Sequence, residues 1–224
     1  MAKSIQILST KKLSGEQRQA LTATNLDVVD IDFIQTQNKS FELKDLNENL
    51  IFTSQNAVHS ILSHPKAEEL KSKNVFCVGL KTKILLSESG FNVVAYTGYA
   101  SDLAEIITLI YRNESFTFFS GNLRRETLPQ ALKEADVKFN EIQVYDTSLT
   151  PQKIKTAFDA ILFFSPSGVE SYLKDNTIKK ETCFCIGETT ADVLHKITKN
   201  IIIADQPTVE DVIEDVIAEY SNKL

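Results

Sequence analysis

The segment IFTSQNAVHSIL (residues 51–62) and the segment FFSPSGVESYL (residues 163–173) follow one pattern. When Ser54 is aligned with Ser165, 111 positions later, both segments continue through two small or polar residues to Ala or Gly and then Val. Both also begin with an apolar run and end in an apolar stretch. A pattern repeated at this distance predicts that the chain contains two related halves.

Two further pairs of segments extend the repeat. NVFCVGLKTKILL (residues 74–86) matches TCFCIGETTADVL (residues 182–194) at an offset of 108, which aligns Gly79 with Gly187. SIQILSTKKLSGEQRQAL (residues 4–21) matches SFTFFSGNLRRETLPQAL (residues 115–132) at an offset of 111. The repeat covers nearly the whole chain, so we expect two similar lobes that arose by internal duplication.

Each half alternates short apolar runs, typical of buried strands, with amphipathic segments. In residues 101–111 the apolar positions recur every three or four residues, which indicates a helix with one buried face. The predicted strands span residues 4–9, 28–33, 49–53, 75–78, 92–95, 116–119, 138–144, 159–164, 182–186 and 200–203. The predicted helices span residues 15–24, 55–63, 81–89, 101–111, 124–135, 166–174, 189–198 and 208–220. This alternation predicts an α/β fold with two doubly wound parallel sheets.

Composition excludes several classes of function. The chain has 224 residues and a formal net charge of −6, which argues against a nucleic-acid-binding protein. No apolar run approaches the ~20 residues that a membrane span needs, and the first residues lack the core of a signal peptide. Cys77, Cys183 and Cys185 lie in apolar runs, so we expect reduced core thiols rather than a metal or redox site. These features predict a cytoplasmic protein.

Hydroxyl-rich loops follow the predicted strands at TSQN (53–56), GLKT (79–82), SGN (120–122), SPSG (165–168) and GETT (187–190). Ligands of parallel sheets bind at this edge, where loops lead into helices. Such residues commonly only cap helices, and this is the simpler interpretation of each one alone. The other interpretation is that the loops direct backbone N–H groups and hydroxyls at an anion. The recurrence of the loops in both halves favours a binding role.

No catalytic or cofactor motif of a known type occurs. The chain lacks G-x-G-x-x-G, the phosphate-binding loop G-x-x-x-x-G-K-[ST] and H-E-x-x-H. His59 and His195 fall inside predicted helices and His64 precedes a proline, so we interpret all three as structural or solvated. The sequence therefore predicts no cofactor and no metal, and an enzyme that acts mainly by holding its substrate in one shape.

The chain resembles the uroporphyrinogen-III synthase family. The segments that carry the resemblance lie in order between about residues 50 and 195, and they are FTSQNAV, VGLKT, SGNLRRETLPQAL, VYDT, FFSPSGV and IGETTADVL. Each motif is short, but six in order on a duplicated α/β chain are specific. Many members have an arginine after the first strand, whereas this chain has Lys11 and Lys12.

The resemblance implies two α/β lobes joined by a two-stranded connector, with a cleft between them. One lobe comprises residues 1–33 with 148–224, the other comprises 36–143, and the connectors lie near 33–36 and 144–148. The equivalent positions of the two crossings in the repeat favour this division. The duplication alone leaves a simple split near residue 112 open.

The resemblance also implies the chemistry. The family closes linear hydroxymethylbilane into uroporphyrinogen III, inverting the last pyrrole ring through a spiro intermediate with loss of water. The family motif places Tyr145 as the catalytic residue, where its phenol donates a proton or hydrogen bond to the departing hydroxyl. A tyrosine that only anchors the connector is the alternative.

The residues that the resemblance assigns to substrate binding are Thr53, Ser54, Asn56, Lys81, Thr82, Asn122, Arg125, Ser165, Ser167, Gly168, Gly187, Thr189 and Thr190. Arg124 could replace its neighbour Arg125 as the basic contact. The expected partner is the polycarboxylate hydroxymethylbilane, with a transient handover from the upstream deaminase, no nucleic acid, no membrane and a monomeric state.

Two other functions remain open from the sequence. A two-lobed protein could bind a small anion without catalysis, closing by a hinge motion. A glycosyl- or phosphoryl-transferring enzyme would need carboxylates at strand ends, and only Glu188 and Asp205 fit that requirement. Neither carboxylate has a partner identifiable from the sequence.

Overall fold

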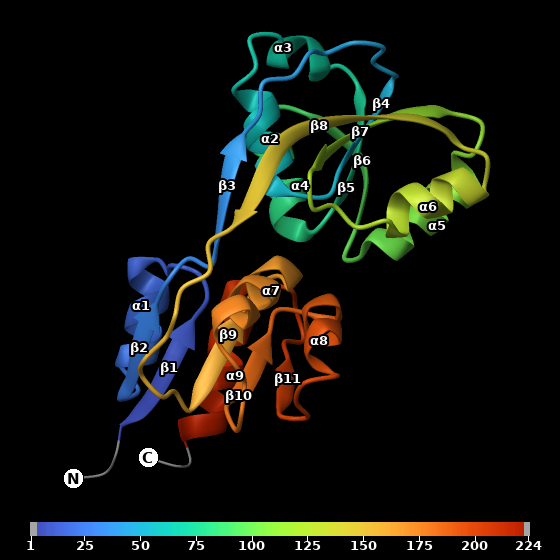
Figure 1. Cartoon of the computed structure of the whole chain (residues 1–224). Coiled ribbons are helices and arrows are strands. Elements are labelled where there is room, and N and C mark those ends of the chain that lie inside the picture. The colour runs from blue at the N-terminus through green and yellow to red at the C-terminus, as the bar shows by residue number, and fades with distance from the viewer. Residues whose placement is uncertain (1–3, 222–224) are drawn as a thin grey trace. The chain divides into compact units, whose positions relative to one another are not determined.

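The computed structural model of the chain describes residues 4–221 and divides into two compact units (Figure 1). Unit 1 consists of Met1–Gln35 and Ser148–Leu224, and unit 2 consists of Thr36–Thr147. The chain therefore passes between the units twice. Each unit has its own sheet and its own core.

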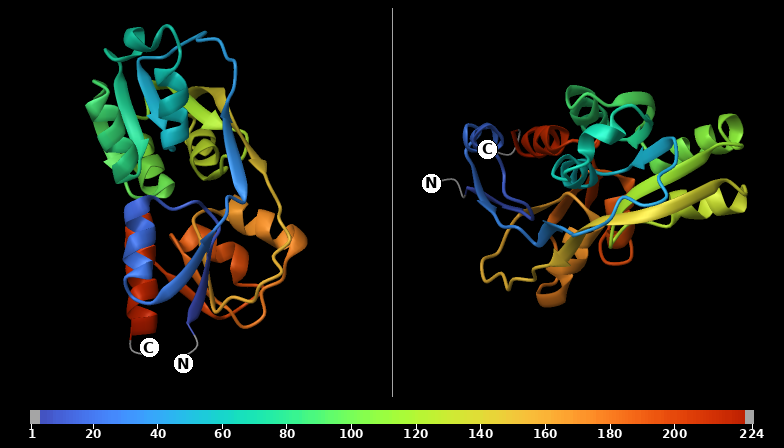
Figure 2. Two further views of the ribbon diagram at one scale, coloured as in Figure 1. Left: turned by 90° about the vertical axis from the view of Figure 1, so that its left-hand side faces the viewer. Right: turned by 90° about the horizontal axis from the view of Figure 1, so that it is seen from above.

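Unit 1 contains a five-stranded parallel sheet of order β11-β10-β9-β1-β2. Its strands are β1 (Ile5–Ser9), β2 (Leu26–Asp30), β9 (Ala160–Phe163), β10 (Thr182–Cys185) and β11 (Ile201–Ile203). Its helices are α1 (Gly15–Thr22), α7 (Pro166–Asp175), α8 (Glu188–Leu194) and α9 (Val209–Ser221). Successive strand residues face opposite sides, so Ile7 packs under α1 and α9 while Leu8 packs under α7 and α8. Figure 2 shows α1 in blue and α9 in red running together.

Unit 2 contains a six-stranded sheet of order β3-β8-β7-β4-β5-β6. Its strands are β3 (Ile34–Asn38), β4 (Asn49–Phe52), β5 (Asn74–Val78), β6 (Asn92–Thr97), β7 (Ser115–Gly121) and β8 (Lys138–Leu149). Its helices are α2 (Gln55–Leu62), α3 (Ala67–Leu70), α4 (Leu80–Glu88), α5 (Ala100–Ile110) and α6 (Thr127–Glu134). Leu50 packs with α2, α3 and α4, whereas Ile51 packs with α5 and α6 on the opposite face. Both faces are thus covered, as continuous apolar strands require.

The strand orders of the two sheets correspond when strands are paired by the sequence repeat. The order β2-β1-β9-β10-β11 of unit 1 matches the order β8-β7-β4-β5-β6 of unit 2. Each sheet takes strands from both halves of the chain, so a simple split near residue 112 is wrong. The parallel α/β architecture is confirmed, and the duplication itself stays an inference that this shared order supports.

The ladder registers correct one detail of the repeat. Ile7 pairs with Ala160 on β9, and Phe116 pairs with Asn49 on β4. Ala160 and Asn49 are 111 positions apart, but Phe116 and Ile7 are only 109 apart. The sequence alignment of Ser9 with Ser120 is therefore out of register by two residues. A shift of two keeps every side chain on its own face, so the apolar pattern is identical in both alignments.

Several element boundaries differ from the sequence predictions. β8 runs on to Leu149 instead of ending at residue 144, and β3 is absent from the strands predicted from apolar runs. Both segments fall where the family resemblance implied a two-stranded connector, near residues 33–36 and 144–148. The two run antiparallel, since the N–H of Lys39 donates to the Val144 carbonyl and that of Thr150 donates to the Phe33 carbonyl. This pairing supplies the ladder partner that prolongs β8. In addition, α3 was missed, α6 begins at Thr127 rather than 124, and α8 ends before His195.

The three cysteines are free and fully buried, as predicted. Burial raises the pKa of the Cys77 thiol to about 11 and that of Cys183 and Cys185 to about 12. The thiols therefore stay protonated at neutral pH. Among the described helices, none combines the length and the apolarity that crossing a bilayer would require.

Candidate active site

The predicted site residues lie at the carboxyl edge of the sheet in their own unit, because all the strands that precede them are parallel. In unit 2 they follow β4, β5 and β7, and they are Thr53, Ser54, Asn56, Lys81, Thr82, Asn122 and Arg125. In unit 1 they follow β9 and β10, and they are Ser165, Ser167, Gly168, Gly187, Thr189 and Thr190. Each unit thus gathers its own candidates at the edge where ligands of parallel sheets bind.

The simpler interpretation, helix capping, holds for two serines. The Ser54 hydroxyl accepts a hydrogen bond from the Asn56 N–H at 3.1 Å at the start of α2. The Ser165 hydroxyl accepts from the Gly168 N–H at 3.0 Å at the start of α7, and it lies 3.1 Å from the Ser167 hydroxyl. Both serines therefore stabilise their helices. The Ser54 hydroxyl hydrogen remains available for another contact, whereas the hydroxyls of Ser165 and Ser167 share one hydrogen bond in which either can donate.

The helices α4 and α8 start differently, because each begins after a glycine. Gly79 and Gly187 are the N-cap residues and supply no side-chain hydrogen bond. Gly79 has φ +89°, a conformation that a residue with a Cβ rarely adopts. In the first turns, Thr82 and Thr190 are buried, with 4% and 1% of their surface exposed. The Gly79 N–H donates to the Thr97 carbonyl and the Thr190 N–H donates to the Gly187 carbonyl. Among the described residues, the backbone N–H groups of Thr82 and Gly187 are therefore the ones of these four positions that are best placed for an anion.

Tyr145 packs over Gly121 at the end of β7. A Cβ built on Gly121 would lie 2.4 Å from the Tyr145 Cζ and 2.8 Å from its hydroxyl oxygen. One face of the ring packs on the core cluster of α2 and α4. Within residues 4–221, no group forms a hydrogen bond with the Tyr145 hydroxyl. The Ser171 hydroxyl is the one side-chain group of these residues that is both buried and unpaired, so the unpaired Tyr145 oxygen is not buried. The phenol oxygen therefore reaches solvent and can donate to a ligand.

Asn122, which the resemblance assigns to substrate binding, forms hydrogen bonds to the neighbouring strand. Its Nδ2 donates to the Thr147 carbonyl at 3.1 Å, and its Oδ1 accepts from the Thr147 N–H at 2.7 Å. Both ends of the amide are thus engaged with one backbone residue of β8. The sequence motif contained Thr147, but nothing in the pattern paired it with Asn122.

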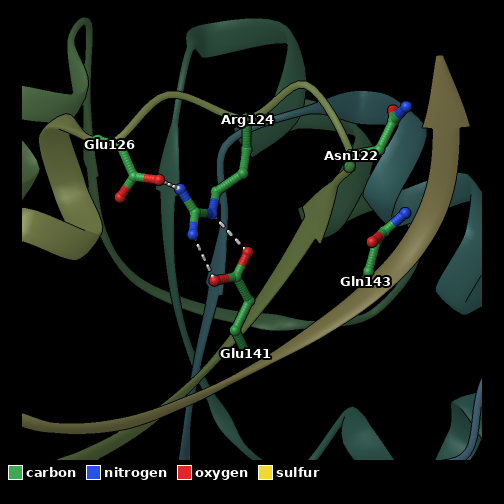
Figure 3. A pocket seen from close by; sticks show the side chains of 6 residues that line it. Asn122, Arg124, Glu126, Glu141 and Gln143 are labelled. Carbon is green, nitrogen blue, oxygen red and sulfur yellow. Dashed lines mark hydrogen bonds and ion pairs between the residues drawn. The ribbon is translucent and has the colours of Figure 1, made fainter. Parts of the chain in front are cut away.

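A hollow of about 450 Å³ adjoins these residues, lined by Gly121, Asn122, Arg124, Glu126, Glu141 and Gln143 (Figure 3). Arg124 binds Glu141 through two nitrogens, at 2.5 and 3.0 Å, and it also pairs with Glu126. Burial alone would raise the pKa of Glu141, but hydrogen bonds from Arg124 and Ser120 outweigh it and hold that pKa below its usual value. The hydrogen bond to Glu141 likewise raises the pKa of Arg124. With two carboxylates against one guanidinium, this hollow does not suit a polyanion. The ion pairs of Arg124 favour Arg125 as the predicted basic contact.

Two features near the candidate residues escaped the sequence prediction. Thr10 is buried beside Gly168 and donates to the Leu162 carbonyl at 2.7 Å, so it ties the end of β1 to β9 next to the start of α7. Glu188, Asp192 and His195 bring their ligand atoms within 4.8 Å of one another on the exposed face of α8. Their helical spacing was readable in the sequence, but exposed acidic groups of this kind are common on helices without a metal. His195 is the C-cap of α8 and not a mid-helix residue.

The comparisons with known proteins agree on one family. Residues 16–214 match the family described as uroporphyrinogen-III synthase HemD. The porphyrin biosynthesis protein HemD of Ruminiclostridium josui is 22% identical over 185 residues, which are 74% of this chain and 36% of that protein. The chain thus spans little more than a third of that relative's length.

Solved structures show the same fold. The uroporphyrinogen-III synthetase of Helicobacter pylori has a TM-score of 0.71 at 20% identity, covering 96% of this chain and 99% of that one. A mutant uroporphyrinogen III synthase of Thermus thermophilus has a TM-score of 0.70 at 12% identity, covering 99% of this chain and all of the other. At these identities the likeness establishes the fold.

Proposed function

This chain belongs to the uroporphyrinogen-III synthase family, and on that premise we propose that it is a hydro-lyase that converts hydroxymethylbilane to uroporphyrinogen III. The match over residues 16–214 carries the proposal, because it covers both units and all the candidate residues. The free phenol of Tyr145 at the carboxyl edge supports it.

The proposed reaction starts at the hydroxymethyl group of the terminal pyrrole. The pyrrole nitrogen pushes out the hydroxyl and leaves an electrophilic azafulvene. The substituted carbon of the last ring attacks it to form a spiro intermediate, and fragmentation and reclosure insert that ring reversed, with net loss of water. Because the substrate closes by itself without inversion, the protein acts mainly by enforcing one geometry.

We assign the proton donor to Tyr145. A phenol is protonated at neutral pH and can donate to the departing hydroxyl, which then leaves as water. The proton released when the new ring becomes aromatic again restores the phenol, so the cycle needs no cofactor. The support for this role is that the hydroxyl reaches solvent while the ring is held between Gly121 and the core.

We propose that backbone N–H groups bind the substrate carboxylates. The starts of α2, α4, α7 and α8 each carry partial positive charge, worth ~0.3–1 kcal/mol per exposed anion contact. Side chains of the same loops would add to this through hydroxyls, an amide and cations, and they belong to Thr53, Ser54, Asn56, Lys81, Arg125, Ser165, Ser167 and Thr189. Such dispersed contacts explain how a chain of net charge −6 can bind a polyanion. Substrate binding should therefore weaken only moderately as ionic strength rises, and a steep salt dependence would contradict this model of binding.

The proposal also covers the cellular compartment, the oligomeric state and the source of the substrate. We place the protein in the cytoplasm as a monomer that takes its unstable substrate directly from the upstream deaminase. Analytical ultracentrifugation at micromolar concentration tests the monomer, and a dimer at those concentrations would overturn it. Titration of the labelled protein with the deaminase tests the handover, which predicts weak and reversible binding.

The deciding experiment supplies freshly made hydroxymethylbilane and separates the oxidised porphyrin isomers by chromatography. Predominant isomer III supports the proposal, and a strong loss of rate in Tyr145→Phe supports the proton donor. Isomer III from an unimpaired Tyr145→Phe variant would keep the synthase and remove the tyrosine from catalysis. Isomer I alone, as in a reaction without protein, would overturn the synthase and leave a binding protein.

A further inference from the structure

Two sequence motifs meet residue by residue at the end of the β7–β8 ladder. Gly121 lies under the Tyr145 ring, and Asn122 bonds to both backbone polar groups of Thr147. The loop motif SGN and the strand motif VYDT are therefore in direct register. Figure 3 shows Asn122 directed toward the strand β8 and away from Arg124.

The ladder is irregular where these motifs meet. Ser120 pairs with Gln143, but the next residue, Gly121, pairs with Tyr145, so Val144 is skipped. An irregularity of this kind changes the direction of a strand and re-aims its side chains. Here it brings the Tyr145 ring over the one residue of β7 that has no side chain. Regular backbone pairing between β7 and β8 ends at this point.

We propose that Asn122 is a positioning residue, whose amide continues the ladder beyond its last backbone pair and thereby fixes Tyr145. The amide supplies one donor and one acceptor, as a peptide group does. Tyr145 then lies between the irregularity at Val144 and the anchored Thr147, two residues further on. Without Asn122, the backbone of this part of β8 would keep β3 as its neighbouring strand but lose its tie to the end of β7. This inference depends on the proposed function, because it assigns Asn122 to the support of the catalytic tyrosine instead of to substrate contact.

The test is a double-mutant cycle with Asn122→Ala and Tyr145→Phe in the isomer III assay. We expect Asn122→Ala alone to lower kcat at least tenfold with little change in KM. In the Tyr145→Phe background the Asn122→Ala substitution should change kcat less than twofold, because the hydroxyl that Asn122 is proposed to position is already absent. Asn113→Ala, an exposed asparagine of the same unit, is the matched control and should leave both constants unchanged.

Two kinetic outcomes would overturn the proposal. A raised KM with unchanged kcat would mean that Asn122 contacts the substrate. An equal loss of kcat in both backgrounds would mean that Asn122 acts independently of Tyr145.

An NMR readout separates this inference from the proposed function. In the wild type, the Thr147 amide should exchange slowly, and the Tyr145 ring should show contacts to the Gly121 Hα. Both signals should be lost in Asn122→Ala, and their persistence would overturn the positioning role whatever the enzyme assay gives. If the wild type forms only isomer I, the catalytic assignment fails, while the same spectra still decide whether Asn122 fixes the tyrosine.

Discussion

Replacing Gly121 with alanine would place a methyl group against the Tyr145 ring. The new Cβ would lie 2.4 Å from Cζ, 2.5 Å from Cε2 and 2.8 Å from the hydroxyl oxygen. Unstrained carbon contacts lie at about 3.5–4.0 Å, so the ring must withdraw by about 1 Å or more. Gly121 does not have a positive φ, so the methyl clash is the whole perturbation.

The expected cost has a stability part and an activity part. Overpacking of this kind destabilises by about 1–3 kcal/mol, which urea denaturation would measure. A displacement of about 1 Å in a reacting group can lower a rate about 100-fold, so we expect a loss of that order in isomer III formation. Gly98→Ala is the matched control, because a Cβ there meets nothing within 4 Å.

The same Gly121→Ala substitution in a Tyr145→Ala variant tests whether the clash with the ring causes the loss. In Tyr145→Ala the ring is gone, so Gly121→Ala should cost less than about 0.5 kcal/mol, since alanine then fits and restricts the unfolded chain. An equal loss of stability in both backgrounds would show that Gly121 is constrained by something other than Tyr145. Wild-type stability and activity in the single variant would show that the ring does not lie over Gly121.

Three further outcomes are expected. Glu141→Gln should lower the unfolding free energy by about 1–2 kcal/mol at pH 7, because charged hydrogen bonds to Arg124 are lost and partial exposure limits their strength. Because the pKa of Glu141 is lower in the folded protein than in the unfolded chain, its carboxylate stabilises the fold when the pH is above the unfolded pKa. This stabilisation is lost as the pH falls through the folded pKa. The two proteins should thus converge in urea titrations as the pH falls below the folded pKa of Glu141, and a constant difference would contradict the ion pair. The native protein should not react with a thiol reagent at pH 8, whereas all three cysteines should react in denaturant; fast labelling without denaturant would show that a thiol is accessible. Ser165→Ala should destabilise by about 1 kcal/mol and Ser165→Gly by only a few tenths, as thermal unfolding can measure, and equal costs would argue against a capping role.

The residues at the carboxyl edges of the sheets show why the roles of side chains could not be assigned from sequence motifs alone. Ser54 and Ser165 satisfy the simpler interpretation, since they cap helices. Thr82 and Thr190 are buried, so the proposed substrate contacts do not use their side chains. The capping and binding interpretations are therefore compatible, because a capped helix start still presents backbone N–H groups to a ligand.

The sequence by itself predicted the described strands except β3, most helix boundaries and the parallel architecture. Apolar periodicity depends on residues close together in the sequence, and the repeat depends on comparing two segments. Both can therefore be recognised without knowing how the chain folds between them. They also identified the loops at the carboxyl edges, and they identified the cysteines as core residues. The family resemblance brought Tyr145 forward as the candidate donor.

Only the tertiary structure decided which groups meet. The strand pattern is unchanged by a shift of two residues, so it fixed neither the register of β1 against β9 nor the irregularity at Val144. Because that irregularity aligns Gly121 with Tyr145, it also makes Asn122 a partner of Thr147. The pairing of Arg124 with Glu141 likewise joins a residue of the loop after β7 to a residue of β8, 17 positions further on. Such contacts depend on distances between strands, which a one-dimensional pattern does not contain.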